Sequence, residues 1–116
     1  ERIGHGYRAA DDEGMLGSMA KRGVHFEVCP TSSYETGGWT GEDWSAHPVR
    51  KMMACGLSVS INSDDPTVFK TSAVEEVRIV EEKVGVGKER IREVMRDALE
   101  KSFASDEEKK QVMALL

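Results

Sequence analysis

The sequence has no long hydrophobic run, and no stretch of roughly 18 apolar residues could span a bilayer. No basic segment followed by an apolar one opens the chain, so no signal peptide is indicated. Clusters of lysine and arginine are also missing, and the formal net charge is -5. Because binding to phosphates needs such clusters, we expect neither a nucleic acid nor a membrane as a partner.

Cysteine is scarce, since only Cys29 and Cys55 occur and they lie far apart in the chain. This spacing gives neither a C-x-x-C motif nor a disulfide scaffold. Two reduced thiols in a cytoplasmic protein are therefore the expectation, and a single bridge between them is the alternative.

The composition is that of a folded protein, with 39% hydrophobic and 32% charged residues over 116 positions. This length suits one domain. The chain starts with Glu1 rather than methionine, so we expect that an upstream segment has been removed. The last helical run reaches Leu115 and Leu116 with no stop signal, which predicts a truncated C-terminus as well.

Short strand-like runs alternate with helical runs along the chain. The strands are predicted at residues 2–7, 24–30 and 57–62. Asp11 and Asp12 are predicted to cap a first helix that ends at Gly23, and Ser45 a second helix over about 47–55. Helices follow to the end, the first carrying an apolar stripe of Val74, Val77 and Val80 and the last beginning with a capping box of Ser105 and Glu108. Residues 31–44 are predicted to form a long loop rich in threonine, serine and glycine.

Three strands separated by helices predict an α/β fold with a parallel sheet, because each connection is long enough for a parallel crossover. Three parallel strands alone leave two open edges. A doubly wound sheet needs more strands, and a (β/α)8 barrel needs eight strands in about 250 residues. The sequence therefore predicts part of a domain.

The third strand has two unlike faces, because side chains alternate along a strand. Leu57, Val59 and Ile61 share an apolar face, whereas small polar residues share the other face with Asp64. In a barrel the polar face would point inward and deliver Asp64 to the C-terminal mouth, where barrel active sites lie.

Two strand ends carry side chains suited to chemistry. His5 lies between Gly4 and Gly6, which would let it project toward a ligand, although a buried structural histidine fits the pattern equally well. Asp64 and Asp65 precede Pro66, so either one aspartate caps a helix beginning near Pro66, or one binds a metal while the other turns toward a substrate.

The other two histidines are predicted to be structural. His25 alternates with Glu27 and Cys29 on one strand face, and residues two apart on one strand rarely close a tetrahedral metal site. His47 stands just before Pro48 at a helix start, which favours a structural or lid role.

Four blocks, "RIGHGY", "HFEVCPTSSYETGGW", "HPVRKM" and "SINSDDPTVFK", resemble in order and spacing the C-terminal half of adenosine deaminases. The resemblance covers nearly the whole chain. It implies the C-terminal portion of a (β/α)8 barrel, with residues 1–116 as part of one domain whose N-terminal half is absent. It further implies one zinc ion, a purine nucleoside substrate, and hydrolysis of adenosine or deoxyadenosine to inosine or deoxyinosine and ammonia.

The resemblance also implies a role for each site residue. His5 would orient the attacking water, assist its deprotonation and assist its attack on C6 of the purine. Asp64 would ligate zinc and accept a hydrogen bond from the attacking water, while Asp65 would bind N7 of the purine. The serine and tyrosine segment after Pro30 would lie near the pocket mouth. Deaminases with cysteine ligands use another signature, so Cys29 and Cys55 are not offered as ligands.

Segments of the family that supply the other zinc ligands and a catalytic glutamate belong to its first half, and this chain has none of them. We therefore expect the isolated chain to lack deaminase activity and to bind zinc weakly. A deaminase for adenine or AMP is the nearest alternative. A non-catalytic barrel fragment that binds a purine or a partner is the alternative from another class.

Overall fold

Three short strands form one parallel sheet in this computed structural model, which describes residues 1–116. The strands are β1 (Arg2–Gly4), β2 (His25–Val28) and β3 (Ser58–Ile61), in the order β1-β2-β3. Arg2 lies opposite His25, and His25 lies opposite Ser58. Strands that follow one another in the sequence are thus adjacent in the sheet. The predicted α/β class with three parallel strands is confirmed.

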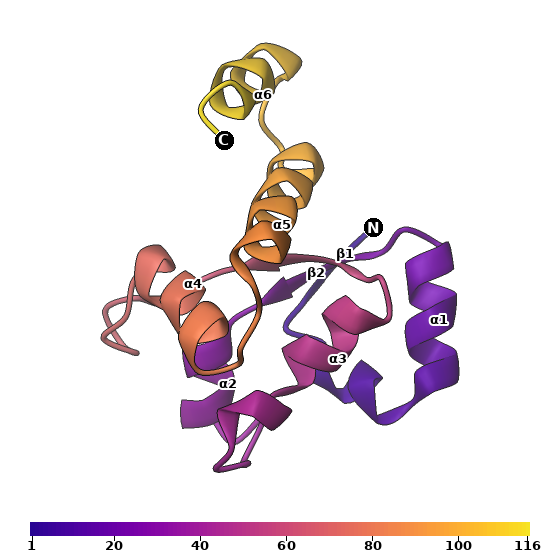
Figure 1. Cartoon of the computed structure of the whole chain (residues 1–116), viewed down its shortest axis with the longest axis vertical. Coiled ribbons are helices and arrows are strands. Elements are labelled where there is room, and N and C mark those ends of the chain that lie inside the picture. Colours follow the sequence, from indigo (N-terminus) through magenta and orange to yellow (C-terminus); the bar gives the residue numbers. More distant parts are fainter.

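Six α-helices and two 3-10 helices complete the fold (Figure 1). They are η1 (Tyr7–Asp11), α1 (Glu13–Lys21), α2 (Pro30–Glu35), η2 (Trp44–Ala46), α3 (Pro48–Ala54), α4 (Ala73–Glu82), α5 (Lys88–Lys101) and α6 (Asp106–Met113). Two predicted caps are present. The Asp12 side chain accepts a hydrogen bond from the Met15 amide, and Ser105 with Glu108 forms the capping box of α6. None of the helices is both long and apolar enough to cross a membrane.

The predictions for the segments of α2 and α3 are wrong in two details. Part of the loop predicted at 31–44 is helical, because Pro30 occupies the first turn of α2, where its fixed φ suits a helix and its missing N–H is not needed. Ser45 does not cap α3, since it lies within η2. The cap of α3 is the ring of His47, whose Nδ1 accepts from the Val49 amide at 3.3 Å.

The core lies between the apolar face of the sheet and the helices packed on it. Phe26, Val28 and Val59 are fully or almost fully buried, as the alternation along the strands predicts. Helices α1, α3, α4 and α5 each contribute to this cluster, for example through Leu16 and Met52. The three strands pair in parallel, so their carboxyl ends lie at the same edge of the sheet.

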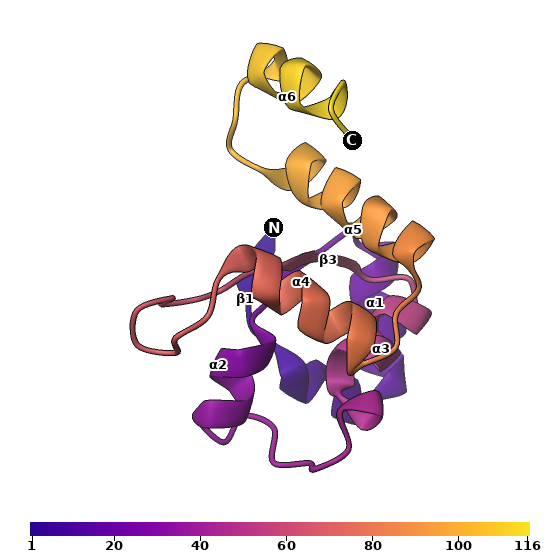
Figure 2. The same ribbon diagram turned by 60° about the vertical axis from the view of Figure 1, so that its left-hand side comes forward.

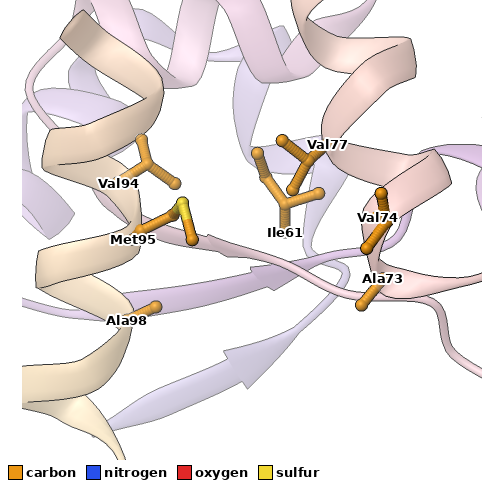
Figure 3. A pocket seen from close by; sticks show the side chains of 7 residues that line it. All are labelled: Ile61, Ala73, Val74, Val77, Val94, Met95 and Ala98. Atoms are coloured by element: carbon orange, nitrogen blue, oxygen red, sulfur yellow. The ribbon is translucent and has the colours of Figure 1, made fainter. Parts of the chain in front are cut away.

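The outer strands and the last helices leave apolar surface uncovered. Strands β1 and β3 each pair with one neighbour only. A groove of about 460 Å³ lies beside β3, between α4 and α5, and Figure 3 shows Ile61, Val77 and Met95 facing it. Helix α6 stands away from the sheet (Figure 2). Val74, predicted in a core stripe, is 70% exposed because it lines this groove, whereas Val80 of the same stripe is fully buried.

Candidate functional site

His5 and Asp64 lie side by side just beyond the ends of β1 and β3. His5 Nε2 is 3.6 Å from a carboxylate oxygen of Asp64, and their side chains are 47% and 37% exposed. With Cys29 at the end of β2, their ligand atoms all lie within 4.8 Å of one another. The structure therefore brings two of the three predicted site residues together at the carboxyl edge of the sheet.

Both residues have a left-handed backbone, with φ of 55° for His5 and 58° for Asp64. Residues with a Cβ adopt this conformation at a cost of about 1–2 kcal/mol, and at a functional site such strain persists when the surroundings impose it. The sheet imposes it at His5, whose amide donates to the Glu27 carbonyl at 2.9 Å. β1 and β3 are thus each followed by a sharp backbone turn, and the side chains of His5 and Asp64 lie next to each other there.

Ser32 holds the Asp64 carboxylate in place. Its hydroxyl donates to Asp64 Oδ2 at 2.6 Å, and Ser32 itself is buried at the start of α2. The family resemblance predicted that this segment lies near the pocket mouth and implied no role for Ser32. A proline directly before T-S-S at a strand end was the signal for a helix that would turn a serine toward the neighbouring strand end.

Asp65 faces away from this contact and stabilises the turn that follows it. Its Oδ1 accepts from the amides of Thr67 and Val68, each at 3.0 Å. The residues after Pro66 form a turn, and the helix expected there begins at Ala73. No helix begins near Pro66, so the expectation that an aspartate caps such a helix is wrong, and Asp65 caps a turn instead. Its second carboxylate oxygen makes no hydrogen bond that would keep it from a ligand.

Cys29 shares the strand edge and is buried. Burial, followed by the charges of Asp64 and Glu76, raises the pKa of its thiol to about 12. Its backbone amide is used structurally, since it donates to the Tyr7 hydroxyl at 2.7 Å. Both cysteines are free, and no disulfide joins them.

The other two histidines are structural, as predicted. His25 is fully buried, and its two ring nitrogens lie 2.9 Å and 3.1 Å from the hydroxyls of Ser58 and Ser60. His47 is 1% exposed, and its ring stacks on the ring of Trp44. Neither ring reaches the strand edge.

The hydrogen bonds of His47 require one neutral tautomer. Its Nδ1 accepts from the Val49 amide, and the Ser33 hydroxyl already donates to the Pro30 carbonyl at 2.7 Å. His47 Nε2, 3.2 Å from that hydroxyl, must therefore donate to it. Protonation at Nδ1 would remove the cap of α3, and burial lowers the pKa of His47 from 6.5 to about 4.

Acid is expected to destabilise the fold through His47. The unfolded chain takes up this proton near pH 6.5 and the folded chain only near pH 4, so the unfolded state binds more protons between these values. The free energy of unfolding should fall by about 3 kcal/mol from pH 7 to pH 4 on this account. Denaturant unfolding of His47→Gln should show a correspondingly shallower pH dependence. Equal slopes for the two proteins would contradict this assignment.

The donor set at the strand edge suits a zinc ion in part. Imidazole and carboxylate are both groups that bind zinc, and catalytic zinc sites use three protein ligands or more. Asp64 presents a half-exposed carboxylate that Ser32 already orients, as metal-ligating carboxylates are oriented in known sites. The residues present thus fit one portion of such a site.

The fold and the strand-edge site define a class: part of a barrel of the amidohydrolase type. An amidohydrolase from Burkholderia ambifaria, solved with bound zinc, superimposes on 97% of the chain with a TM-score of 0.83 and 30% identity. The chain covers 31% of that structure. The predicted (β/α)8 fold class is thereby confirmed.

The family follows from the sequence comparisons. The model of the adenosine deaminase family matches residues 1–116. Rat adenosine deaminase is 35% identical over the whole chain, and an adenine deaminase of Rhizobium leguminosarum is 36% identical over 99% of it. The chain belongs to the adenosine deaminase family. It spans about a third of the length of these curated relatives, 32% and 35% respectively.

Proposed function

We propose that residues 1–116 are the C-terminal part of a single barrel domain. Three features support this: the chain spans a third of its relatives, the sheet has two unpaired edges, and an apolar groove runs beside β3. A neighbouring strand and helix from the rest of a barrel would pair with β3 and cover Ile61 and Met95. The two open edges are then where the barrel closes.

The whole protein, in this proposal, is a zinc-dependent deaminase that hydrolyses adenosine or deoxyadenosine to inosine or deoxyinosine and ammonia. The observation that carries the proposal is the placement of His5 beside Asp64 at the carboxyl ends of parallel strands, in a chain of this family. Barrel enzymes hold their chemistry at that edge. The two free thiols suit the cytoplasm, where we place the protein.

Each site residue has one task. Asp64 would hold the zinc ion, which when bound lowers the pKa of water to about 7 and so makes hydroxide available at neutral pH. His5, with Nε2 directed at the Asp64 carboxylate, would orient the attacking water and take up its proton. Asp65 would hold the purine in register through a hydrogen bond to N7; because N7 has a lone pair and no hydrogen, the carboxyl group of Asp65 would donate this bond in its protonated form. Water replaces the 6-amino group, which leaves as ammonia.

Adenine and AMP are the competing substrates. An adenine deaminase stands among the relatives at an identity equal to that of the adenosine deaminases. The segment "CPTSSYETGGW" resembles the adenosine-specific type more closely, and this favours the nucleoside.

The substrate is tested by ammonia release from the full-length protein supplied with zinc. We expect kcat/KM to be highest for adenosine or deoxyadenosine, with adenine and AMP at least about tenfold lower, a difference of about 1.4 kcal/mol in transition-state binding. A higher value for adenine or AMP would move the proposal to that substrate. If none of these substrates released ammonia, the proposal that the protein is a purine deaminase would be wrong.

The isolated chain of residues 1–116 serves as the matched control. With one predicted zinc ligand and an unclosed barrel, it should release no ammonia from any of these substrates. Calorimetric titration with zinc should give weak binding. Tight, stoichiometric zinc binding by this chain would contradict the partial site proposed here.

A further inference from the structure

Glu76 is a fully buried carboxylate outside the strand-edge site. It lies in the first turns of α4, has no exposed surface, and has no part in the roles assigned above. A carboxylate taken out of water costs several kcal/mol unless hydrogen bonds compensate for its lost solvation. Such a residue in the middle of an otherwise apolar helix face therefore calls for a reason.

Two hydrogen bonds from different segments hold the Glu76 carboxylate. Its Oε2 accepts from the backbone amide of Thr31 at 3.0 Å, and its Oε1 accepts from the hydroxyl of Thr71 at 2.6 Å. Thr31 belongs to the first turn of α2, whose amides have no partner within the helix. Thr71 ends the turn that begins at Asp65. One side chain thus ties α2 to the far end of this turn.

The first of these bonds leads directly to Asp64. Thr31 precedes Ser32, and the Ser32 hydroxyl donates to the Asp64 carboxylate at 2.6 Å. Because Glu76 fixes the amide of Thr31, it fixes the start of α2 and with it the direction of the Ser32 hydroxyl. The Asp64 carboxylate is thereby held through two successive contacts.

The second bond holds the turn itself. Asp64 at the start of this segment and Lys70 near its end both have a left-handed backbone, with φ of 58° and 50°. Two strained residues in one short turn would relax unless both ends were held. Ser32 holds the first end at Asp64, and Glu76 holds the second end at Thr71, directly after Lys70.

We propose that Glu76 is a positioning residue that sets the orientation of Asp64 through α2 and of Asp65 through the turn. This inference rests on the proposed function, in which Asp64 binds the metal and Asp65 binds the purine. Glu76 touches neither, and its effect reaches the site through Thr31 and Thr71.

The test uses the full-length protein and its Glu76→Ala variant, with zinc affinity measured by competition against a chelator. Loss of a residue that orients a metal ligand typically lowers metal affinity about tenfold to a hundredfold, and we expect that loss here. Glu76→Gln can form both bonds again, since its amide oxygen accepts from Thr31 and its NH2 group donates to Thr71. It should therefore restore most of the affinity. Glu75→Ala, on the exposed side of the same turn, should leave it unchanged.

A purely structural role predicts a different result. Glu76→Ala would then lower the melting temperature and leave the zinc affinity of the folded protein unchanged, which would overturn the proposal. If Glu76→Ala does not fold, Thr71→Val replaces it, because this variant removes one hydroxyl and keeps the shape. An unchanged zinc affinity in folded Thr71→Val would overturn the proposal as well. The titration uses zinc alone, so it remains decisive even if the protein deaminates no purine.

Discussion

Asp64→Ala in the full-length protein is expected to abolish tight zinc binding and with it the deaminase activity. The carboxylate is the one zinc ligand that we assign to this chain, so its removal would leave the zinc site without a ligand from residues 1–116. Removing a ligand should exceed the tenfold to hundredfold cost of disturbing a ligand's support. We therefore expect a loss of more than about a hundredfold in kcat, together with loss of zinc measured by metal analysis.

Asp65→Ala separates the two aspartates. It should retain zinc and lose kcat/KM by about a hundredfold, the effect of a misplaced substrate. Asp11→Ala is the control, because Asp11 is an exposed carboxylate paired only with Arg8. Equal zinc loss in Asp64→Ala and Asp65→Ala would show that the roles of the pair are assigned wrongly.

Gly6→Ala is expected to be the most damaging of the glycine substitutions. Gly6 has φ of 69°, and a Cβ there would lie 2.6 Å from two ring carbons of Phe26 and 3.1 Å from Ile3. The left-handed backbone costs about 1–2 kcal/mol, and the overlap with a buried ring costs about 1–3 kcal/mol more. We expect about 3 kcal/mol of lost stability in denaturant unfolding of the full-length protein, and displacement of the adjacent His5.

Gly17→Ala provides the opposite case on the same fold. Gly17 lies inside α1, and no atom stands within 4 Å of a Cβ at this position. Alanine there should raise the free energy of unfolding by about 0.5–1 kcal/mol, because it restricts the unfolded chain and favours the helix. A Gly6→Ala protein as stable as Gly17→Ala would refute the close contact with Phe26. At Gly4, by contrast, an added Cβ would meet only a carboxylate oxygen of Glu27, at 3.9 Å, so this position has room for a side chain.

The strands and the placement of His5 and Asp64 could be predicted because both depend on short-range patterns. The alternation of Val59 and Ile61 with small polar residues gives the two faces of β3. Burial follows it only in part, since Val59 is fully buried, whereas Ile61 lines the open groove and Ser60 is buried beside His25. Parallel strands then bring their carboxyl ends to one edge. The glycines beside His5 were expected to let its side chain project, and the ring lies at the strand edge, with Nε2 3.6 Å from the Asp64 carboxylate.

The errors fall where a side chain's partner lies far along the sequence. Ser45 is a good capping residue in general, but the buried His47 ring takes that place because Ser33 holds it from α2. The sequence pattern assigned no role to Glu76, because its two partners come from segments that no local pattern connects to it. Val74 was predicted in the core from the apolar stripe alone, but it lines the groove between α4 and α5, and no segment of this chain covers it.

The left-handed backbones of His5 and Asp64 lower the stability of the fold at the two positions whose side chains the proposed reaction requires. Glycine would relieve the strain at either position and would also discard the side chain that the proposed reaction needs. Selection for thermal robustness alone would therefore favour glycine at positions 5 and 64 and would enrich inactive proteins. Any programme of directed evolution on this protein would need to screen the proposed turnover alongside melting temperature.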